Sequence, residues 1–152
     1  MIEIVKPTIL DCEQMKTLID KFAKTQVVLP RPIEDVAERI REFYIAKDGT
    51  KVIATSSLRI FHPNLAEIRT ITIDENYQKQ GLGRKLIEKE LGEAKALGIT
   101  RVFALTMQVE FFKKMRFAFI DKKNLPLKKI WEDCIKCPLF PDCNEEALII
   151  DL

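Results

Sequence analysis

The chain has 152 residues, enough for one domain with a buried core, and its 47% apolar and 32% charged content is typical of a folded globular protein. Its net charge of +2 comes from 25 basic residues interspersed among 23 acidic ones, which excludes binding to nucleic acid through overall charge. The sequence has no apolar run that spans a bilayer and no signal peptide at its start, so we expect one cytoplasmic domain over residues 1–152.

The chain opens with a strand pattern followed by two helix patterns. Ile2 to Val5 alternates as a short strand, and Asp11 to Lys24 carries apolar residues at helical spacing. Pro32 and the acidic residues after it suit the start of a second helix. Its apolar stripe includes Ile33, Val36, Ile40 and Phe43, so this helix should pack along that stripe.

Three strand patterns come next. Phe43 to Ala46 and Val52 to Phe61 are joined by Asp48-Gly49, a sequence typical of a hairpin turn. Glu67 to Ile73 follows after a turn at His62-Pro63-Asn64. We expect these strands to be antiparallel neighbours.

The second half predicts a third helix and then further strands. The helix, Gly83 to Leu97, ends at Gly98, which suits a left-handed cap, and its apolar face is Leu86, Ile87, Leu91, Ala94 and Leu97. The remaining patterns predict a strand, a short helix and two strands at Val102–Thr106, Glu110–Lys114, Phe117–Asp121 and Ala147–Asp151. The predicted order is β-α-α-β-β-β-α-β-α-β-β, with a loop of about 25 residues before the last strand, a length that is usually functional or tethered.

The junction between the third of the neighbouring strands and the third helix is suited to hold an anion. Gly81 and Gly83 let the backbone approach a ligand closely, and a helix N-terminus presents unpaired N–H groups at the positive end of its dipole. Arg84 and Lys85 face that same positive end, so they should cost helix stability unless an anion binds there.

The glycines of this junction match neither of two common nucleotide-binding motifs. A dinucleotide-binding fingerprint needs a glycine where the chain has Leu86, and a P-loop needs Gly-Lys-Ser/Thr. The remaining match is Gln-x-x-Gly-x-Gly from Gln78 to Gly83. With the order of elements, it resembles the acyl-CoA loop of the GCN5-related N-acetyltransferases. That resemblance implies a mixed α/β (α+β) domain, with a mostly antiparallel sheet flanked by helices, and acetyl-CoA as acetyl donor.

The resemblance also implies which residues contact acetyl-CoA. Backbone groups of Ile71 and Ile73 would pair with the pantetheine arm, and an N–H of Ile71 or Thr72 would meet the reaction's oxyanion. The pyrophosphate would lie on the loop and helix start, at Gln78, Lys79, Gln80, Gly81, Leu82, Gly83, Arg84 and Lys85.

A second family signature is only partly present. Thr106 stands where an Asn is common, and Phe112 stands where the family has the tyrosine usually proposed to protonate the thiolate. We expect both residues near the cofactor, with Phe112 alone of the local aromatic residues in contact with CoA.

Several short blocks, among them Leu29-Pro30-Arg31-Pro32 and Ala66-Glu67-Ile68-Arg69, resemble the single-domain amino-acid acetyltransferases related to N-acetylglutamate synthase. The resemblance implies transfer of acetyl to the α-amine of L-glutamate, the first step of arginine biosynthesis, and a homodimer. Arg31 and Arg69 are the candidate carboxylate clamps, because guanidinium groups bind carboxylates bidentately. Alternatively, Arg31 is solvated between its prolines and Arg69 pairs with Glu67.

Glu67 is the candidate general base for the acceptor ammonium, directly or through water; its alternative is a salt-bridged strand residue. His62, the only histidine, is expected at the surface, with the base as its alternative role. The chemistry needs no covalent enzyme intermediate, so Cys12 is assigned no nucleophilic role.

Cys134, Cys137 and Cys143 cluster in the long loop. Three thiols are one fewer than a structural zinc site usually has, so we rank no permanent metal first, zinc second and a disulfide third.

Two other functions remain open at this point. An acetyltransferase of protein N-termini or lysines would need an exposed acceptor groove, and a catalytically weak module would bind acyl-CoA as a sensor. The absent tyrosine favours the latter. A small-molecule amino-acid acceptor, with no nucleic acid and no membrane, is the first expectation.

Overall fold

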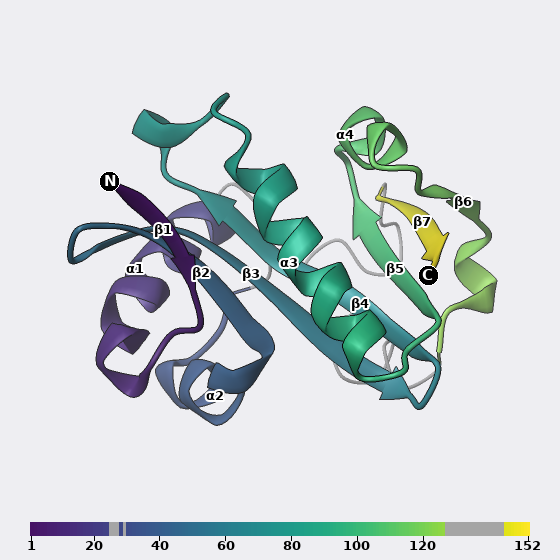
Figure 1. Ribbon diagram of the computed structural model, residues 1–152, viewed down its shortest axis with the longest axis horizontal. Coiled ribbons are helices and arrows are strands. Elements are labelled where there is room, and N and C mark those ends of the chain that lie inside the picture. The colour runs from purple at the N-terminus through teal and green to yellow at the C-terminus, as the bar shows by residue number, and fades with distance from the viewer. Residues whose placement is uncertain (25–27, 29, 127–144) are drawn as a thin grey trace. The chain divides into compact units, whose positions relative to one another are not determined.

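The structure is a computed structural model that describes residues 1–24, 28, 30–126 and 145–152. Its order of helices and strands is the predicted one (Figure 1). The elements are β1 (Ile2–Val5), α1 (Cys12–Ala23), α2 (Ile33–Glu38), β2 (Phe43–Asp48), β3 (Lys51–His62), β4 (Leu65–Ile73), α3 (Leu82–Ala96), β5 (Arg101–Thr106), α4 (Val109–Lys114), β6 (Ala118–Ile120) and β7 (Glu146–Asp151). Short 3-10 helices lie at Ile9–Asp11, Ile40–Glu42, Glu75–Tyr77 and Lys122–Asn124.

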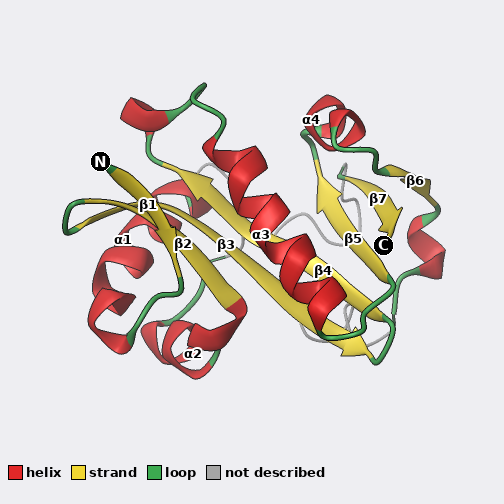
Figure 2. Ribbon diagram, viewed as in Figure 1, coloured by secondary structure: helices red, strands yellow, loops and turns green. Residues whose placement is uncertain are grey.

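The strands form one mixed sheet in the order β1-β2-β3-β4-β5-β7-β6, coloured yellow in Figure 2. Its pairs β1–β2, β2–β3, β5–β7 and β6–β7 are antiparallel and β4–β5 is parallel, so the predicted mostly antiparallel α/β fold is confirmed. The described residues divide into two compact units, the first made of Met1–Leu58 and Ile68–Glu93 and the second of Arg59–Glu67 and Ala94–Leu152.

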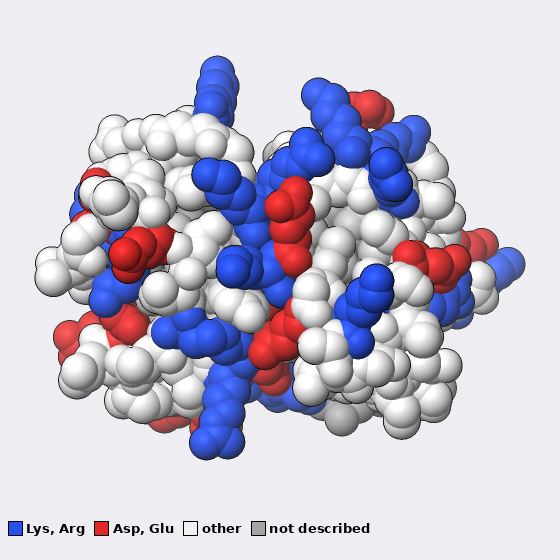
Figure 3. Space-filling view, in the orientation of Figure 1, with Lys and Arg blue, Asp and Glu red and all other residues white. Residues whose placement is uncertain are grey.

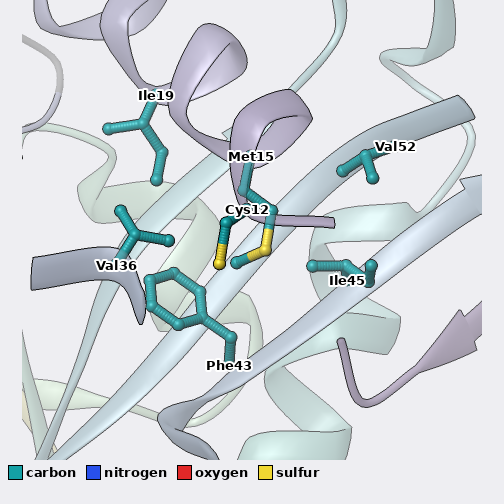
Figure 4. Packing of buried hydrophobic residues seen from close by; sticks show 7 residues of the cluster. All are labelled: Cys12, Met15, Ile19, Val36, Phe43, Ile45 and Val52. Carbon is teal, nitrogen blue, oxygen red and sulfur yellow. The ribbon is translucent and has the colours of Figure 1, made fainter. Parts of the chain in front are cut away.

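In the first unit, β2 separates two packed faces because successive strand residues point to opposite sides. Phe43 and Ile45 point to the side of α1 and α2, where they join an apolar cluster. Figure 4 shows this cluster, which consists of Cys12, Met15, Ile19, Val36, Phe43, Ile45 and Val52. It fixes the first two helices on one face of β2 and β3.

Helix α3 covers the other face of these strands. Leu82 and Leu86 pack against Ala46 and Ala54 in a second cluster. The predicted apolar face of this helix was wrong at its end, because Leu97 lies beyond the last turn and is 61% exposed. Glu90 is instead fully buried on that face, and no sequence pattern indicated it.

The second helix is shorter than its apolar stripe predicted. Helix α2 ends at Glu38, a 3-10 turn follows, and Phe43 is already the first residue of β2, opposite Ser57 of β3. Strand pairing therefore ended the helical period, while Ile33, Val36 and Ile40 still pack on the same cluster.

The second unit contains the end of β3 and the start of β4, together with the end of α3 and the elements that follow it. Strand β4 pairs with β5 through Leu65, Ala66 and Glu67, and β7 pairs with β5 on its other edge. Of the helices in the described part of the chain, none combines the length and the apolar character that crossing a membrane requires.

Candidate functional site

The loop between β4 and α3 has a backbone that needs its glycine. Gln78 anchors the loop, because its side-chain amide donates to the carbonyl of Ile73 at 3.0 Å. Lys79 and Gly81 then adopt left-handed φ angles of 63° and 81°. Side chains rarely tolerate that region, which explains the glycine at the second position.

Helix α3 begins directly after this turn. The first helical hydrogen bond at its start runs from the Lys85 N–H to the Gly81 carbonyl, at 3.1 Å, so the N–H groups of residues 82–84 precede the helical ladder. The position where a Cβ of Gly81 would lie has no atom within 4 Å. An anion can therefore approach the backbone here, at the positive end of a helix of 15 residues.

The cations at this helix start have a local partner. The Arg84 guanidinium donates to Glu88 one turn later at 3.0 Å, and both side chains are more than half exposed. Such an exposed pair contributes little, so it reduces only part of the cost of cations at the helix N-terminus. Figure 3 shows basic side chains, interspersed with acidic ones, where α3 lies in Figure 1.

Strand β4 is irregular at Thr70, a β-branched residue with a left-handed φ of 56°. Two neighbouring carbonyls there accept from hydroxyls of β3: Ser57 donates to the carbonyl of Arg69 at 3.0 Å and Thr55 donates to the carbonyl of Thr70 at 2.8 Å. Successive carbonyls of a regular strand point to opposite sides. Because the carbonyls of Arg69 and Thr70 both point toward β3, the backbone here departs from the regular hydrogen-bond pattern of a strand.

The direction of the two carbonyls fixes the direction of two amides. In a trans peptide the C=O and the following N–H point in opposite directions. The N–H groups of Thr70 and Ile71 therefore both point away from the two hydroxyls. Neighbouring N–H groups aimed the same way form a concave site for negative charge. This arrangement can stabilise an oxyanion, and it includes Ile71, one of the two residues, Ile71 or Thr72, for which the family resemblance implied that role.

Arg31 is buried beside this irregularity, with only 4% of its surface exposed. Its Nε donates to Asp35 at 2.6 Å and its Nη1 donates to the Thr70 hydroxyl at 2.9 Å, while its guanidinium lies 5.3 Å from the centre of the Phe43 ring. The Nη2 atom is buried and has no hydrogen-bond partner among the described residues. A solvated arginine between two prolines is therefore wrong for this residue.

The charges around Arg31 favour an added anion. Burial, and then the positive charge of Arg69, lower the pKa of the Arg31 guanidinium, although Asp35 and Glu42 oppose them. Burial raises the pKa of Asp35, but its bonds to Arg31 and Arg39 outweigh this and lower that pKa below its ordinary value. Asp35 thus bonds to both Arg31 and Arg39, Glu42 adds a second carboxylate through Arg39, and Arg69 is a third cation nearby.

Three of the predicted site residues lie in the second unit. Glu67 is 2% exposed on β4, opposite Phe103 of β5. Thr106 ends β5, and its hydroxyl accepts from the Gln108 N–H at 2.7 Å, so it shapes the turn before α4. Phe112 is buried with edge-on contacts to Phe111 and Phe117 at 5.4 and 5.1 Å between ring centres.

The other predicted candidates are peripheral or cannot be described. His62 is exposed and its Nδ1 lies 2.6 Å from the side-chain oxygen of Asn64, as expected for a surface turn. Within the described residues no group of three or more metal-ligating side chains occurs. Cys134, Cys137 and Cys143 lie outside those residues.

Sequence reasoning missed the polar residues that support the site. In the sequence, three of them are only β-branched or small residues of predicted strands: Thr55, Ser57 and Thr70. Asp35 is there only an acidic residue suited to a helix start. One pattern was available: the run Thr55-Ser56-Ser57 places hydroxyls in the middle of a strand that is buried from Val52 to Leu58. Buried hydroxyls need partners, so such a run indicates an irregular neighbouring strand.

Known proteins resemble this chain over most of its length. Residues 12–117 match the model of the acetyltransferase (GNAT) family. An uncharacterized N-acetyltransferase of Chlorobaculum tepidum is 33% identical over 91% of this chain and 89% of its own. An amino-acid acetyltransferase of Mycobacterium tuberculosis is 30% identical over 82% of this chain and 72% of its own.

The fold also has solved counterparts. The N-acetylglutamate synthase of Neisseria gonorrhoeae, crystallised with coenzyme A and N-acetyl-glutamate, superimposes on 100% of this chain with a TM-score of 0.86 at 21% identity. This chain spans 35% of that protein.

Proposed function

Because this chain belongs to the acetyltransferase (GNAT) family, we propose that it transfers acetyl from acetyl-CoA to the α-amine of an acidic amino acid, L-glutamate first. The observation that carries the acceptor class is the buried Nη2 of Arg31, a donor without a partner among the described residues. A buried guanidinium N–H that lacks an acceptor is costly, and a substrate carboxylate supplies one.

Acetyl-CoA is bound along β4 and the start of α3 in this proposal. The pyrophosphate lies at the bare Cα of Gly81, against the N–H groups that precede the helical ladder. The pantetheine pairs with backbone groups of Ile71 and Ile73. The Ile73 carbonyl already accepts from Gln78, so its second lone pair serves the cofactor.

The acceptor's carboxylate binds Arg31 through one nitrogen. Because Nε and Nη1 are already engaged by Asp35 and Thr70, Nη2 is the part of the fork that remains for substrate. The sequence predicted bidentate carboxylate binding by Arg31. Such binding would require the bond to Asp35 or the bond to Thr70 to break. Arg69 adds positive charge and, in this proposal, receives the second carboxylate of glutamate.

The reaction then needs no covalent enzyme intermediate. The ammonium of the acceptor gives a proton to a base, for which Glu67 is our candidate, and the amine nitrogen attacks the thioester carbon. The carbonyl oxygen becomes an oxyanion that the Ile71 N–H stabilises. Collapse breaks the C–S bond, coenzyme A leaves as thiolate, and proton transfer from the new amide nitrogen yields neutral thiol and the N-acetyl amino acid.

Relatives support an amino-acid acceptor. The M. tuberculosis relative is named an amino-acid acetyltransferase, and the gonococcal structure contains N-acetyl-glutamate. Acetylation of glutamate places the proposed activity at the first step of arginine biosynthesis.

The proposed function is tested by thiol release from acetyl-CoA in the presence of single amino acids and short peptides. We expect stimulation by glutamate, less by glutamine or aspartate, and none by peptides. Stimulation by peptides alone would make the chain a protein acetyltransferase. Tight coenzyme A binding with no stimulation would make it a binding module.

Arg31→Ala is expected to raise the KM for glutamate about 100-fold, because it removes a buried charge-assisted bond to the substrate. The affinity for coenzyme A, measured by calorimetry, should stay within about twofold, because the bonds of Arg31 go to Asp35 and Thr70 and not to the residues assigned to the cofactor.

The matched control for Arg31 is Arg39→Ala, which removes the other partner of Asp35. Arg39 has no bond to Thr70, so the KM of the Arg39→Ala protein for glutamate should remain near that of the unmodified protein. A folded Arg31→Ala protein with an unchanged KM would remove Arg31 from the acceptor site.

A further inference from the structure

We propose that Thr55 is a positioning residue. Its hydroxyl, together with that of Ser57, holds the left-handed turn of β4 at Thr70. This turn aims the N–H groups of Thr70 and Ile71 at the acetyl carbonyl oxygen. This inference rests on the proposed function for its reaction, and on contacts within the first unit for its geometry. Neither hydroxyl contacts a substrate in it.

The conformation at Thr70 needs external support. A β-branched residue with φ of 56° is strained, and such a backbone persists only where its surroundings determine it. Three bonds do so here: Thr55 and Ser57 hold two carbonyls, and Arg31 donates to the Thr70 side chain. All of these groups are on buried or half-buried residues, so water cannot easily replace them.

A second hydroxyl fixes the direction of the Thr55 proton. Thr55 and Thr72 lie 2.7 Å apart through their Oγ1 atoms. A hydroxyl has one proton, and Thr55 gives its proton to the Thr70 carbonyl at 2.8 Å. Thr72 is therefore the donor to Thr55, and the chain of bonds runs from Thr72 through Thr55 to the β4 backbone.

Register explains why the positioning residues come from β3. Thr55 and Ser57 are opposite Ile45 and Phe43 of β2, so they share the face on which Arg31 lies over the Phe43 ring. Ser56 between them points to the other face, where it donates to Glu90 of α3 at 3.0 Å. Alternation thus divides the three hydroxyls between the β4 turn and helix packing.

The test compares Thr55→Val, which keeps the shape but removes the proton, with Thr55→Ser, which keeps the hydroxyl. Thr55→Val should lower kcat about 10-fold to 100-fold, since a misdirected oxyanion donor loses part of the effect of deleting one. The KM for glutamate and the Kd for coenzyme A should stay within about twofold. Thr55→Ser should restore most of kcat.

Thr17→Val is the matched control, because it removes a hydroxyl that donates to a backbone carbonyl at 3.0 Å on the exposed face of α1. It should leave kcat unchanged. NMR measurement of the Thr70 φ angle supplies a readout independent of turnover: Thr55→Val should shift φ from the left-handed region toward an extended average.

Slow hydrolysis of acetyl-CoA without an amino acid separates this inference from the proposed function, because water attack forms the same kind of oxyanion. If no amino acid is acetylated, the acceptor proposal fails while the hydrolysis rate of Thr55→Val still tests the positioning role. A folded Thr55→Val protein with unchanged rates, or with lowered rates and an unchanged Thr70 φ, would overturn it.

Discussion

Gly81→Val is expected to weaken coenzyme A binding about 100-fold or more, because two penalties coincide at this residue. Its φ of 81° is strained for any side chain and most of all for a β-branched one. The space into which the side chain would project has no protein atom within 4 Å, and it is the space we assign to the pyrophosphate. Calorimetric titration of coenzyme A measures the loss.

Two other glycines separate these penalties. Gly98, the cap of α3, has a similar φ of 88° and equally open surroundings, so Gly98→Val imposes the strain without blocking the phosphate loop. Gly92 lies inside α3 with open surroundings and no positive φ, so Gly92→Val imposes neither. We expect both to bind coenzyme A normally. An equal loss in Gly98→Val would assign the effect to stability, and undiminished binding by Gly81→Val would remove the loop from the cofactor site.

The order of elements could be predicted because most of them carry a clear period. Alternation identified β1, the Asp48-Gly49 turn identified the hairpin of β2 and β3, and a 3.6-residue period identified α1 and α3. The sequence pattern placed Phe43 both in the apolar stripe of the second helix and at the start of the next strand, because this residue fits either pattern. Its pairing opposite Ser57 decided between them, and that pairing is a long-range interaction.

The site could be predicted only where function depends on backbone conformation. Gly81 was found because only glycine suits that turn. Carboxylate binding by Arg31 stays a prediction, and the bonds of Arg31 to Asp35 and Thr70 were not predicted, because they depend on how a loop meets β4. The left-handed φ of Thr70 was unforeseeable from a threonine in a strand pattern, since that residue type disfavours it.

The burial of Glu90 was also not predicted, because glutamate is usually a surface residue. Its burial leads to the second large expected effect, a pH dependence of stability. A glutamate among Leu86, Ile87 and Ala94 interrupts the apolar face of α3 in the sequence, yet its side chain is fully buried. Burial raises the pKa of Glu90 to about 8, opposed by its bond from Ser56 and by Lys6, and assisted by Glu93 and Glu42. Tyr44 also faces it, and Glu90 contributes to the raised pKa of that phenol after burial and Glu93.

The stability of the chain should therefore fall as pH rises. Below the unfolded pKa of about 4.5 both states hold the proton, and between that pH and about 8 the folded state alone retains it. The unfolded state then binds fewer protons, so stability is lost with rising pH and levels off above about 8. The contribution of Glu90 to this loss totals about 5 kcal/mol.

Glu90→Gln removes this titration and is expected to leave the protein more stable than the unmodified chain by a few kcal/mol at pH 8.5, but not at pH 4.5, which urea denaturation at both pH values measures. The amide oxygen of the new glutamine can accept from Ser56 as the carboxyl does.

Because that amide also brings an N–H₂ group into a buried position, Glu90→Met is the companion variant, and it should show the same flattened pH dependence. Glu88→Gln, on the exposed face of the same helix, is the control and should keep the original slope. If Glu90→Gln and Glu90→Met both lose stability between pH 4.5 and 8.5 as steeply as the unmodified chain, the buried carboxyl is not the source of the pH dependence.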